Sequence, residues 1–162
     1  LLMSINYMNV IKQRYLNLGY QPYRWFKAER EIKKCGLKLP LEKSRVGLLS
    51  TSGAYRIGQR AFHYKDDTSV RKINKATPEA DIHFSHITEN YLANARKDPN
   101  CIFPIRQLNR LEANGIIGSL ASEMLSCMGG IYSQRRVLSE LAPTILSVFK
   151  QQEVDVVLLV PM

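Results

Sequence analysis

Small hydroxyl-bearing residues follow the first strongly apolar segment of the chain, and they are the first candidates for a binding site. The apolar run Val46–Thr51 ends in Ser50 and Thr51, and Ser52 and Gly53 come next. In open α/β sheets, ligands bind just beyond the carboxyl ends of the strands. We therefore expect Ser50, Thr51 and Ser52 to line a substrate pocket. The segment is not a phosphate loop, because it matches neither G-x-G-x-x-G nor G-x-x-x-x-G-K-S/T.

A histidine and a glycine-containing turn are the next candidates. His86 stands at the end of the alternating segment Ala80–His86, where its side chain could enter a site. There it could shuttle a proton or stabilise an anionic nucleophile, and a hydrogen-bonded structural role is the alternative. Met128 and Gly129 lie in a flexible turn, and we expect both of them to line the same pocket.

The cysteines suggest neither a disulfide framework nor a zinc site. Cys35, Cys101 and Cys127 are widely spaced and no C-x-x-C occurs. His83 and His86 are three residues apart in a predicted strand, which places them on opposite faces, so no metal site is predicted. A catalytic pair of Cys101 or Cys127 with His86 stays open, because nothing in the spacing selects one. Neither H-E-x-x-H nor G-x-S-x-G occurs, so the residues alone contain no complete catalytic set.

The composition is that of a globular protein with a basic surface. The chain has 162 residues, 45% of them hydrophobic and 23% charged, and a formal net charge of +9. Basic residues concentrate in Lys27–Lys38 and Lys65–Lys75. Nucleic-acid binding is one explanation, but no zinc finger, RNA-binding signature or Arg-rich arm accompanies them, so solvated surface charge is favoured. No apolar run suits a membrane span and no signal peptide is visible, so we expect a cytoplasmic protein.

The order of the predicted elements favours an α/β fold with a mostly parallel open sheet and flanking helices. Strands are expected at 46–51, 69–73, 80–86, 116–121 and 156–161, and helices at 4–19, 104–114 and 133–152. Pro143 is expected to kink or split the last helix. The final apolar run predicts a buried parallel strand. Residues 1–40 are expected to form an N-terminal helical arm and linker, and residues 41–162 an α/β domain.

Several short segments, in order along most of the chain, resemble one family. It is the selenoprotein B family of glycine, sarcosine and betaine reductases, with the selenoprotein subunit of D-proline reductase and cysteine-containing relatives. The segments are Tyr15–Trp25, Val46–Gly53, Ala80–Ile82 with Ser85 and His86, Asp98–Asn100, Phe103–Ile105, Arg110 and Leu111, Gly115–Gly118, Cys127–Tyr132 and Val154–Pro161. Two positions depart from the pattern: Cys127 replaces a usual Phe, and Tyr55 stands where the family often has His.

The resemblance implies a reductase in which the last strand precedes the reactive residue. In the family, selenocysteine or cysteine follows the segment that matches Val154–Pro161, so we expect it immediately after Met162. Residues 41–162 would then be an incomplete, C-terminally truncated reductase domain. A UGA selenocysteine codon read as a stop, a fragment and a pseudogene are three explanations that the protein sequence leaves open.

The resemblance also implies the chemistry and the partners. A selenolate or thiolate would cleave a C–N bond of a small amino-acid or amine substrate. No cofactor is expected in this chain, whereas a partner subunit would carry a pyruvoyl group and a thiol would act as reductant. A homo- or hetero-oligomer is expected. The family's substrates cannot be assigned to this chain, because Cys127 and Tyr55 depart from the family pattern. A non-catalytic binding or scaffold paralogue is the alternative, and a nucleic-acid-binding protein is a third reading.

Overall fold

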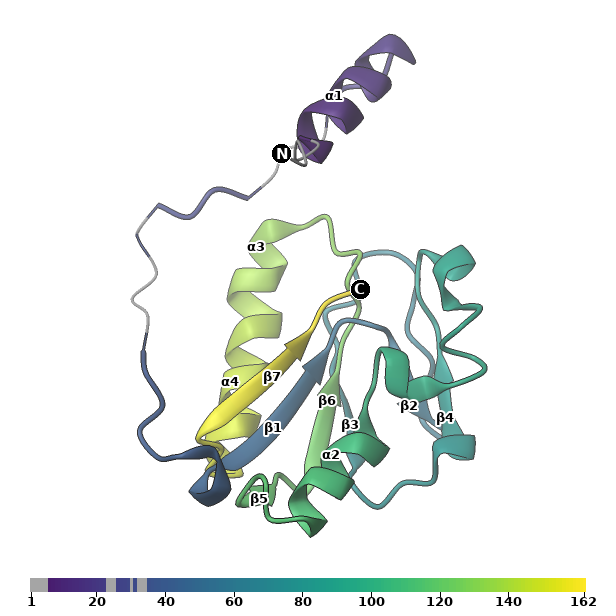
Figure 1. Ribbon diagram of the computed structural model, residues 1–162. Helices are drawn as coiled ribbons and strands as arrows, with labels where there is room; N and C mark the ends of the chain where they lie inside the picture. The colour runs from purple at the N-terminus through teal and green to yellow at the C-terminus, as the bar shows by residue number, and fades with distance from the viewer. Residues whose placement is uncertain (1–5, 23–25, 30, 32–34) are drawn as a thin grey trace, which may run out of the picture. The chain divides into compact units, whose positions relative to one another are not determined.

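The structure is a computed structural model that describes residues 6–22, 26–29, 31 and 35–162 (Figure 1). The chain divides into two compact units, residues 1–34 and 35–162. In the first unit, helix α1 spans Tyr7–Asn17 and none of its residues is buried. This confirms a helix within the expected range 4–19, although residues 4 and 5 lie outside the described residues. Asn6 caps the helix, because its side chain accepts a hydrogen bond from the Asn9 amide at 3.2 Å.

The second unit is built on a five-stranded sheet in which β1 is the central strand (Figure 1). The strands are β1 (Arg45–Ser50), β3 (Arg71–Asn74), β5 (Ser119–Leu120), β6 (Glu123–Ser126) and β7 (Val156–Val160). β1 pairs in parallel with β5, β6 and β7, whereas β3 pairs antiparallel with β6. A separate antiparallel pair joins β2 (Ala54–Arg56) to β4 (Ile82–Phe84). The predicted α/β class with a mostly parallel sheet is confirmed.

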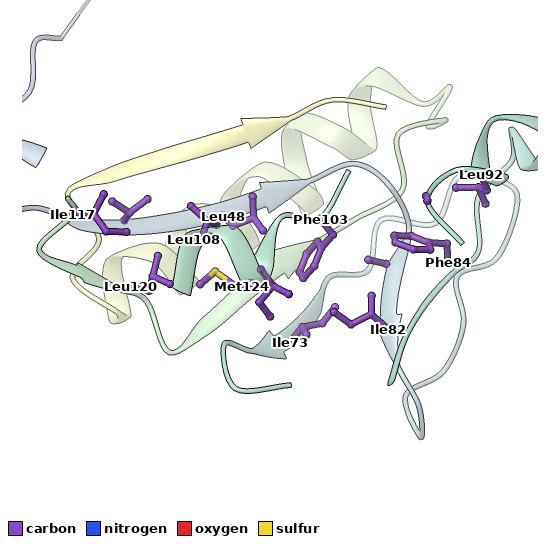
Figure 2. Close-up of a cluster of buried hydrophobic side chains, with 14 residues drawn as sticks. Leu48, Ile73, Ile82, Phe84, Leu92, Phe103, Leu108, Ile117, Leu120 and Met124 are labelled. Carbon is purple, nitrogen blue, oxygen red and sulfur yellow. The ribbon is translucent and has the colours of Figure 1, made fainter. Parts of the chain in front are cut away.

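Helices lie on both faces of the sheet because β1 is apolar on both sides. Leu48 belongs to a core cluster that includes Leu108 of α2 (Ile105–Ala113), as Figure 2 shows. Leu49 packs on the opposite cluster, which contains Phe149 of α4 (Ala142–Gln151). Consecutive strand residues point to opposite faces, so each helix receives alternate side chains of β1. This arrangement fixes the carboxyl end of β1 between two packed layers.

Short helical turns complete the described chain. They are η1 (Leu41–Lys43), η2 (Glu79–Asp81), η3 (Glu89–Leu92), η4 (Pro99–Cys101), α3 (Gln134–Arg136) and the π-helical η5 (Val137–Leu141). No helix in the described part of the chain combines the length and apolar character that crossing a membrane requires.

The last helical region is continuous rather than split at Pro143. Ser133 caps it, since its hydroxyl accepts a hydrogen bond from the Arg136 amide at 3.4 Å. The helical conformation then runs unbroken through α3, η5 and α4, and Pro143 falls in the first turn of α4. A proline ring clashes with the carbonyl four residues earlier in a regular helix. The wider π-helical turn just before Pro143 provides room for the ring without a break.

The final strand has the expected partner but not the expected burial. β7 runs parallel to β1 over five residues, from Val46 opposite Val156 to Ser50 opposite Val160. However, β1 is its one strand partner among the described residues, so β7 is an edge strand. The Leu159 side chain is 64% exposed, and the prediction of a buried strand is wrong in this respect. An apolar run has the same pattern in an edge strand and in a central strand, so periodicity cannot separate them.

Candidate functional site

The carboxyl end of β1 lies against the turn that follows β6. The Ser50 carbonyl accepts a hydrogen bond from the Cys127 amide at 3.0 Å, and the Gly53 amide donates to the Cys127 carbonyl at 3.0 Å. Between these bonds, Ser52 and Met128 form an antiparallel bridge. These contacts bring residues 50–53 and 127–129 together, as expected for loops at one edge of a parallel sheet.

Thr51 holds the main chain that leaves β7. Its amide donates to the Val160 carbonyl at 3.1 Å. Its hydroxyl accepts from the Met162 amide at 2.8 Å and donates to the Met162 carbonyl at 3.3 Å. Both polar groups of the Met162 main chain therefore bond to the side chain of Thr51, the residue that directly follows the central strand.

His86 lies in the interior beside this junction. The residue is only 5% exposed. The amide and the hydroxyl of Thr88 lie 3.1 Å and 2.6 Å from Nδ1 of its ring. The Gly129 amide lies 3.3 Å from its Nε2. Burial lowers the pKa of the ring, and the nearby Glu89 carboxylate and the Thr51 carbonyl oppose this shift. The ring is therefore held in its neutral form at neutral pH.

Gly129 is required by the close approach of three groups. A Cβ atom at this position would lie 2.7 Å from the Met162 carbonyl oxygen, and 3.0 Å from both His86 Nε2 and the Thr51 carbonyl oxygen. Distances this short leave no space for a side chain. The structure thus brings Thr51, His86 and Gly129 together around Met162, whereas the sequence could suggest only that each stood at the end of its element.

The other predicted pocket residues lie behind this cluster, in the interior. Ser50, Ser52 and Met128 are buried, and the Ser50 and Ser52 hydroxyls are 2.7 Å apart. The Ser50 hydroxyl also lies 2.7 Å from the Ile102 carbonyl, to which it donates. In the structure as it stands, these side chains support the end of β1. Ser126 Oγ, on the neighbouring strand, is buried without a hydrogen-bond partner in the described chain.

The cysteines differ strongly in their surroundings. Cys127 is buried, and the loss of solvation raises the pKa of its thiol to about 12. It is therefore a protonated, weakly nucleophilic thiol at neutral pH, which removes the physical basis for a catalytic pair of Cys127 with His86. Cys35 and Cys101 are exposed. The rings of His83 and Tyr55 lie side by side, tilted by 37° with their centroids 6.0 Å apart.

Two supporting residues carry no sequence signal of their role. Thr88 holds the His86 ring from the segment after β4. The Asp66 carboxylate accepts from the Tyr132 and Ser133 amides at 2.7 Å and 3.0 Å, which ties the excursion between β2 and β3 to the start of α3. Both are polar residues in irregular segments, where sequence patterns predict only turns.

Comparison with known proteins relates the chain to a reductase subunit. It is 31% identical over 119 residues to the D-proline reductase subunit gamma of Acetoanaerobium sticklandii. The match covers 74% of this chain and 49% of that protein, so the chain spans about half the length of the relative. No protein-family model and no solved structure matches. The chain is therefore a distant relative of a D-proline reductase subunit, and the resemblance inferred from its short segments is confirmed only as a relationship to a reductase family.

Proposed function

We propose that this chain forms part of a subunit of a selenol- or thiol-dependent reductase that cleaves a C–N bond in a small amino-acid or amine substrate. The observation that carries the proposal is the convergence of Thr51, His86 and Gly129 on the main chain of Met162. In the reductase family, the segment that matches β7 is followed directly by selenocysteine or cysteine. The proposed nucleophile would thus stand at the carboxyl edge of the sheet, where α/β proteins place their chemistry.

The burial of Cys127 supports a nucleophile that lies at the exposed edge of the sheet rather than in the interior. Cys127 is the cysteine nearest to this cluster in sequence, and its raised pKa keeps it protonated. A selenol or a thiol at the exposed edge would ionise far more readily, because it would keep its solvation. The ionised group would attack the carbon that bears nitrogen and displace the amine, which leaves a selenoether or thioether. A second thiol would then attack the selenium or sulfur and release the reduced carbon with a proton, and the selenenyl-sulfide or disulfide so formed would be reduced by the thiol reductant.

The substrate, the pyruvoyl-bearing partner subunit and the oligomeric state enter the proposal by resemblance. No residue of this chain is assigned to hold the pyruvoyl group, which would belong to the partner. The name of the relative includes the words "subunit gamma", which fits an assembly of several subunits in that enzyme. We propose a comparable assembly here, with a small amino acid or amine as substrate.

The test uses the gene sequence and the full-length protein. The proposal requires a selenocysteine (TGA) or cysteine codon directly after the segment that matches β7, and any other codon there would remove the proposed nucleophile. The protein carrying Cys at that position should reduce D-proline, glycine or betaine in a thiol-dependent manner with its partner subunits. The variant carrying Ser there should be inactive. Equal turnover by the Cys and Ser forms would show that the nucleophile lies elsewhere.

A non-catalytic binding or scaffold role is the second candidate, and helix α1 favours it. Tyr7, Val10 and Leu18 are 67%, 54% and 63% exposed in a helix region without a buried residue. Residues 1–34 also hold seven of the 23 basic residues but only two of the 14 acidic ones. An exposed basic and apolar helix suits docking to an acidic partner surface. Assembly with partner subunits but no turnover by the Cys form would favour this role, and salt-dependent retention on DNA would favour nucleic-acid binding.

A further inference from the structure

Strand β4 has an outer edge without a strand partner. Among the described residues, β4 pairs only with β2, in a sheet of two strands (Figure 1). The Ser85 amide donates to the Gly53 carbonyl at 3.0 Å, and the Ile57 amide donates to the Asp81 carbonyl at 2.8 Å. Main-chain groups alternate in direction along an antiparallel strand, so the odd-numbered residues of this segment bond toward β2. The main-chain groups of its even-numbered residues point away from β2.

Three main-chain groups on this outer edge are free to bond to another chain. The Ile82 amide is already used, because it donates to the Glu79 carbonyl in the turn before the strand. The Ile82 carbonyl and the amide and carbonyl of Phe84 take part in no hydrogen bond within the described part of the chain. The side chains of Ile82 and Phe84 are fixed in the core cluster (Figure 2). The edge is therefore rigid and can accept a further extended segment.

A hollow of about 440 Å³ lies along this edge, and we call it the β4 groove. Its lining includes all three residues of β4 and, from the segment before α2, Arg96, Lys97 and Pro99. The volume lies within the range of about 300–1,000 Å³ that is typical of ligand pockets in proteins. The free main-chain groups of β4 thus border an open space rather than packed side chains.

The charges of the β4 groove favour an acidic occupant. Lys97 forms none of the ion pairs found among the described residues, and the side chain of Arg96, which pairs with Glu89, is 49% exposed. Glu79 is the one acidic residue of the lining, and Arg106 already pairs with it at 3.2 Å. Basic side chains at a sheet edge discourage pairing with neutral or basic strands. They attract an acidic segment and so give the edge specificity.

The β4 groove is connected to the candidate site. Phe84 stands two residues before His86, and the Gly129 amide donates to Nε2 of the His86 ring at 3.3 Å. Glu89, the partner of Arg96, also accepts a hydrogen bond from the His86 amide at 3.3 Å. A segment bound along β4 therefore lies next to the stretch of chain that positions His86.

We propose that the β4 groove is a docking site at which a partner protein adds an extended acidic segment as a third strand beside β4. The main-chain groups of Phe84 and the Ile82 carbonyl hold the backbone of this segment, and its acidic side chain pairs with Lys97. In such strand addition, main-chain bonds supply affinity and side-chain contacts supply specificity. That the partner is another subunit of the reductase rests on the proposed function, whereas the docking site itself does not.

The test uses the full chain and a short blocked peptide in which valine and glutamate alternate. We expect this peptide to shift the NMR signal of the Phe84 amide and to slow the hydrogen exchange of that amide. A peptide with lysine in place of glutamate should bind more weakly. The acidic peptide methylated at alternate main-chain nitrogens cannot form the ladder and should not bind.

Two charge reversals separate specific docking from general attraction. Lys97→Glu should weaken binding of the acidic peptide about fivefold or more, because an attraction is replaced by a repulsion. The same variant should bind the lysine peptide more tightly than the wild type does. Lys150→Glu, in the last turn of α4, is the matched control with the same change in net charge, and it should leave both affinities close to those of the wild type.

Four results would overturn the proposal. They are an unchanged Phe84 amide at millimolar acidic peptide, equal losses in Lys97→Glu and Lys150→Glu, full binding of the methylated peptide, and the same amide shifts with free glutarate. The last would show a site for small acids rather than for a strand. These measurements require neither substrate nor turnover, so they can fail while the reductase assay succeeds, and the reverse.

Discussion

Cys127 makes stability at alkaline pH a quantitative test of the burial at the end of β6. Its thiol is buried, and desolvation raises the pKa from 9.0 to about 12. In the unfolded chain the thiol ionises near pH 9, whereas the folded state keeps it protonated. The unfolded state therefore gains stability from ionisation as the pH rises above 9, and the free energy of unfolding falls until the pH reaches the folded pKa.

The size of the effect follows from the interval between the two pKa values. Each pH unit in this interval lowers the free energy of unfolding by about 1.4 kcal/mol. At pH 10.5 the loss from Cys127 is therefore about 2 kcal/mol relative to pH 8. Tyrosines and lysines also titrate in this range, so the total loss alone does not identify Cys127.

A comparison with Cys127→Ala isolates this contribution, because both proteins share all the other titrating groups. Urea unfolding at pH 8 and pH 10.5 gives the loss of stability for each protein. We expect the wild type to lose about 2 kcal/mol more than the variant over this interval. Equal losses in the two proteins would refute a buried, protonated thiol. Cys101→Ala, at an exposed cysteine, is the control and should behave like the wild type.

Three further predictions concern stability. Leu48→Ala, at a fully buried position of β1, should lower the free energy of unfolding in urea by about 2–5 kcal/mol. Leu159→Ala, at the exposed edge, should change it by less than about 0.5 kcal/mol. Similar losses in the two variants would contradict the packing described. Glu112 accepts from Lys75 Nζ at 2.7 Å and from a backbone amide of β5, and although burial raises its pKa, these bonds lower it overall. Its stabilisation should be present above its unfolded pKa of 4.5 and be lost as the pH falls through the folded pKa, and Glu112→Gln should lack this acid dependence in urea titrations. Asp66→Ala should remove the carboxylate that accepts two amides at the start of α3 and cost about 1 kcal/mol, with faster exchange of those two amides; unchanged exchange would argue against this anchor.

The sequence predicts the parts of the fold that have long, regular patterns. The apolar run at Val46–Thr51 predicted β1, and the spacing of Ile105 and Leu108 after Pro104 predicted α2. β2 and β6 were not predicted, because each is only a few residues long and is defined by pairing rather than by pattern. The burial of β7 was predicted wrongly for the same reason, since only the presence of a further strand distinguishes an edge strand from a central one.

The site was predictable as a list of positions but not as an arrangement. Thr51, His86 and Gly129 stand at ends of elements, and that placement alone marked them. The bonds between Thr51 and Met162 join residues 111 positions apart, and no local pattern encodes them. Thr88 has no periodic or motif signal, because its role consists of hydrogen bonds to the neighbouring ring of His86.

The dependence of β1 on β7 has a consequence for synthesis on the ribosome. The two strands pair over their full common length, with Val46 opposite Val156 and Ser50 opposite Val160. Translation at about 5–20 residues per second separates their emergence by roughly 5–20 s. During that time one edge of β1 carries unpaired amides and carbonyls, which can template pairing with another nascent chain. Crowded polysomes or slow translation of the final codons should therefore increase aggregation of this protein, and a chaperone that covers β1 should reduce it.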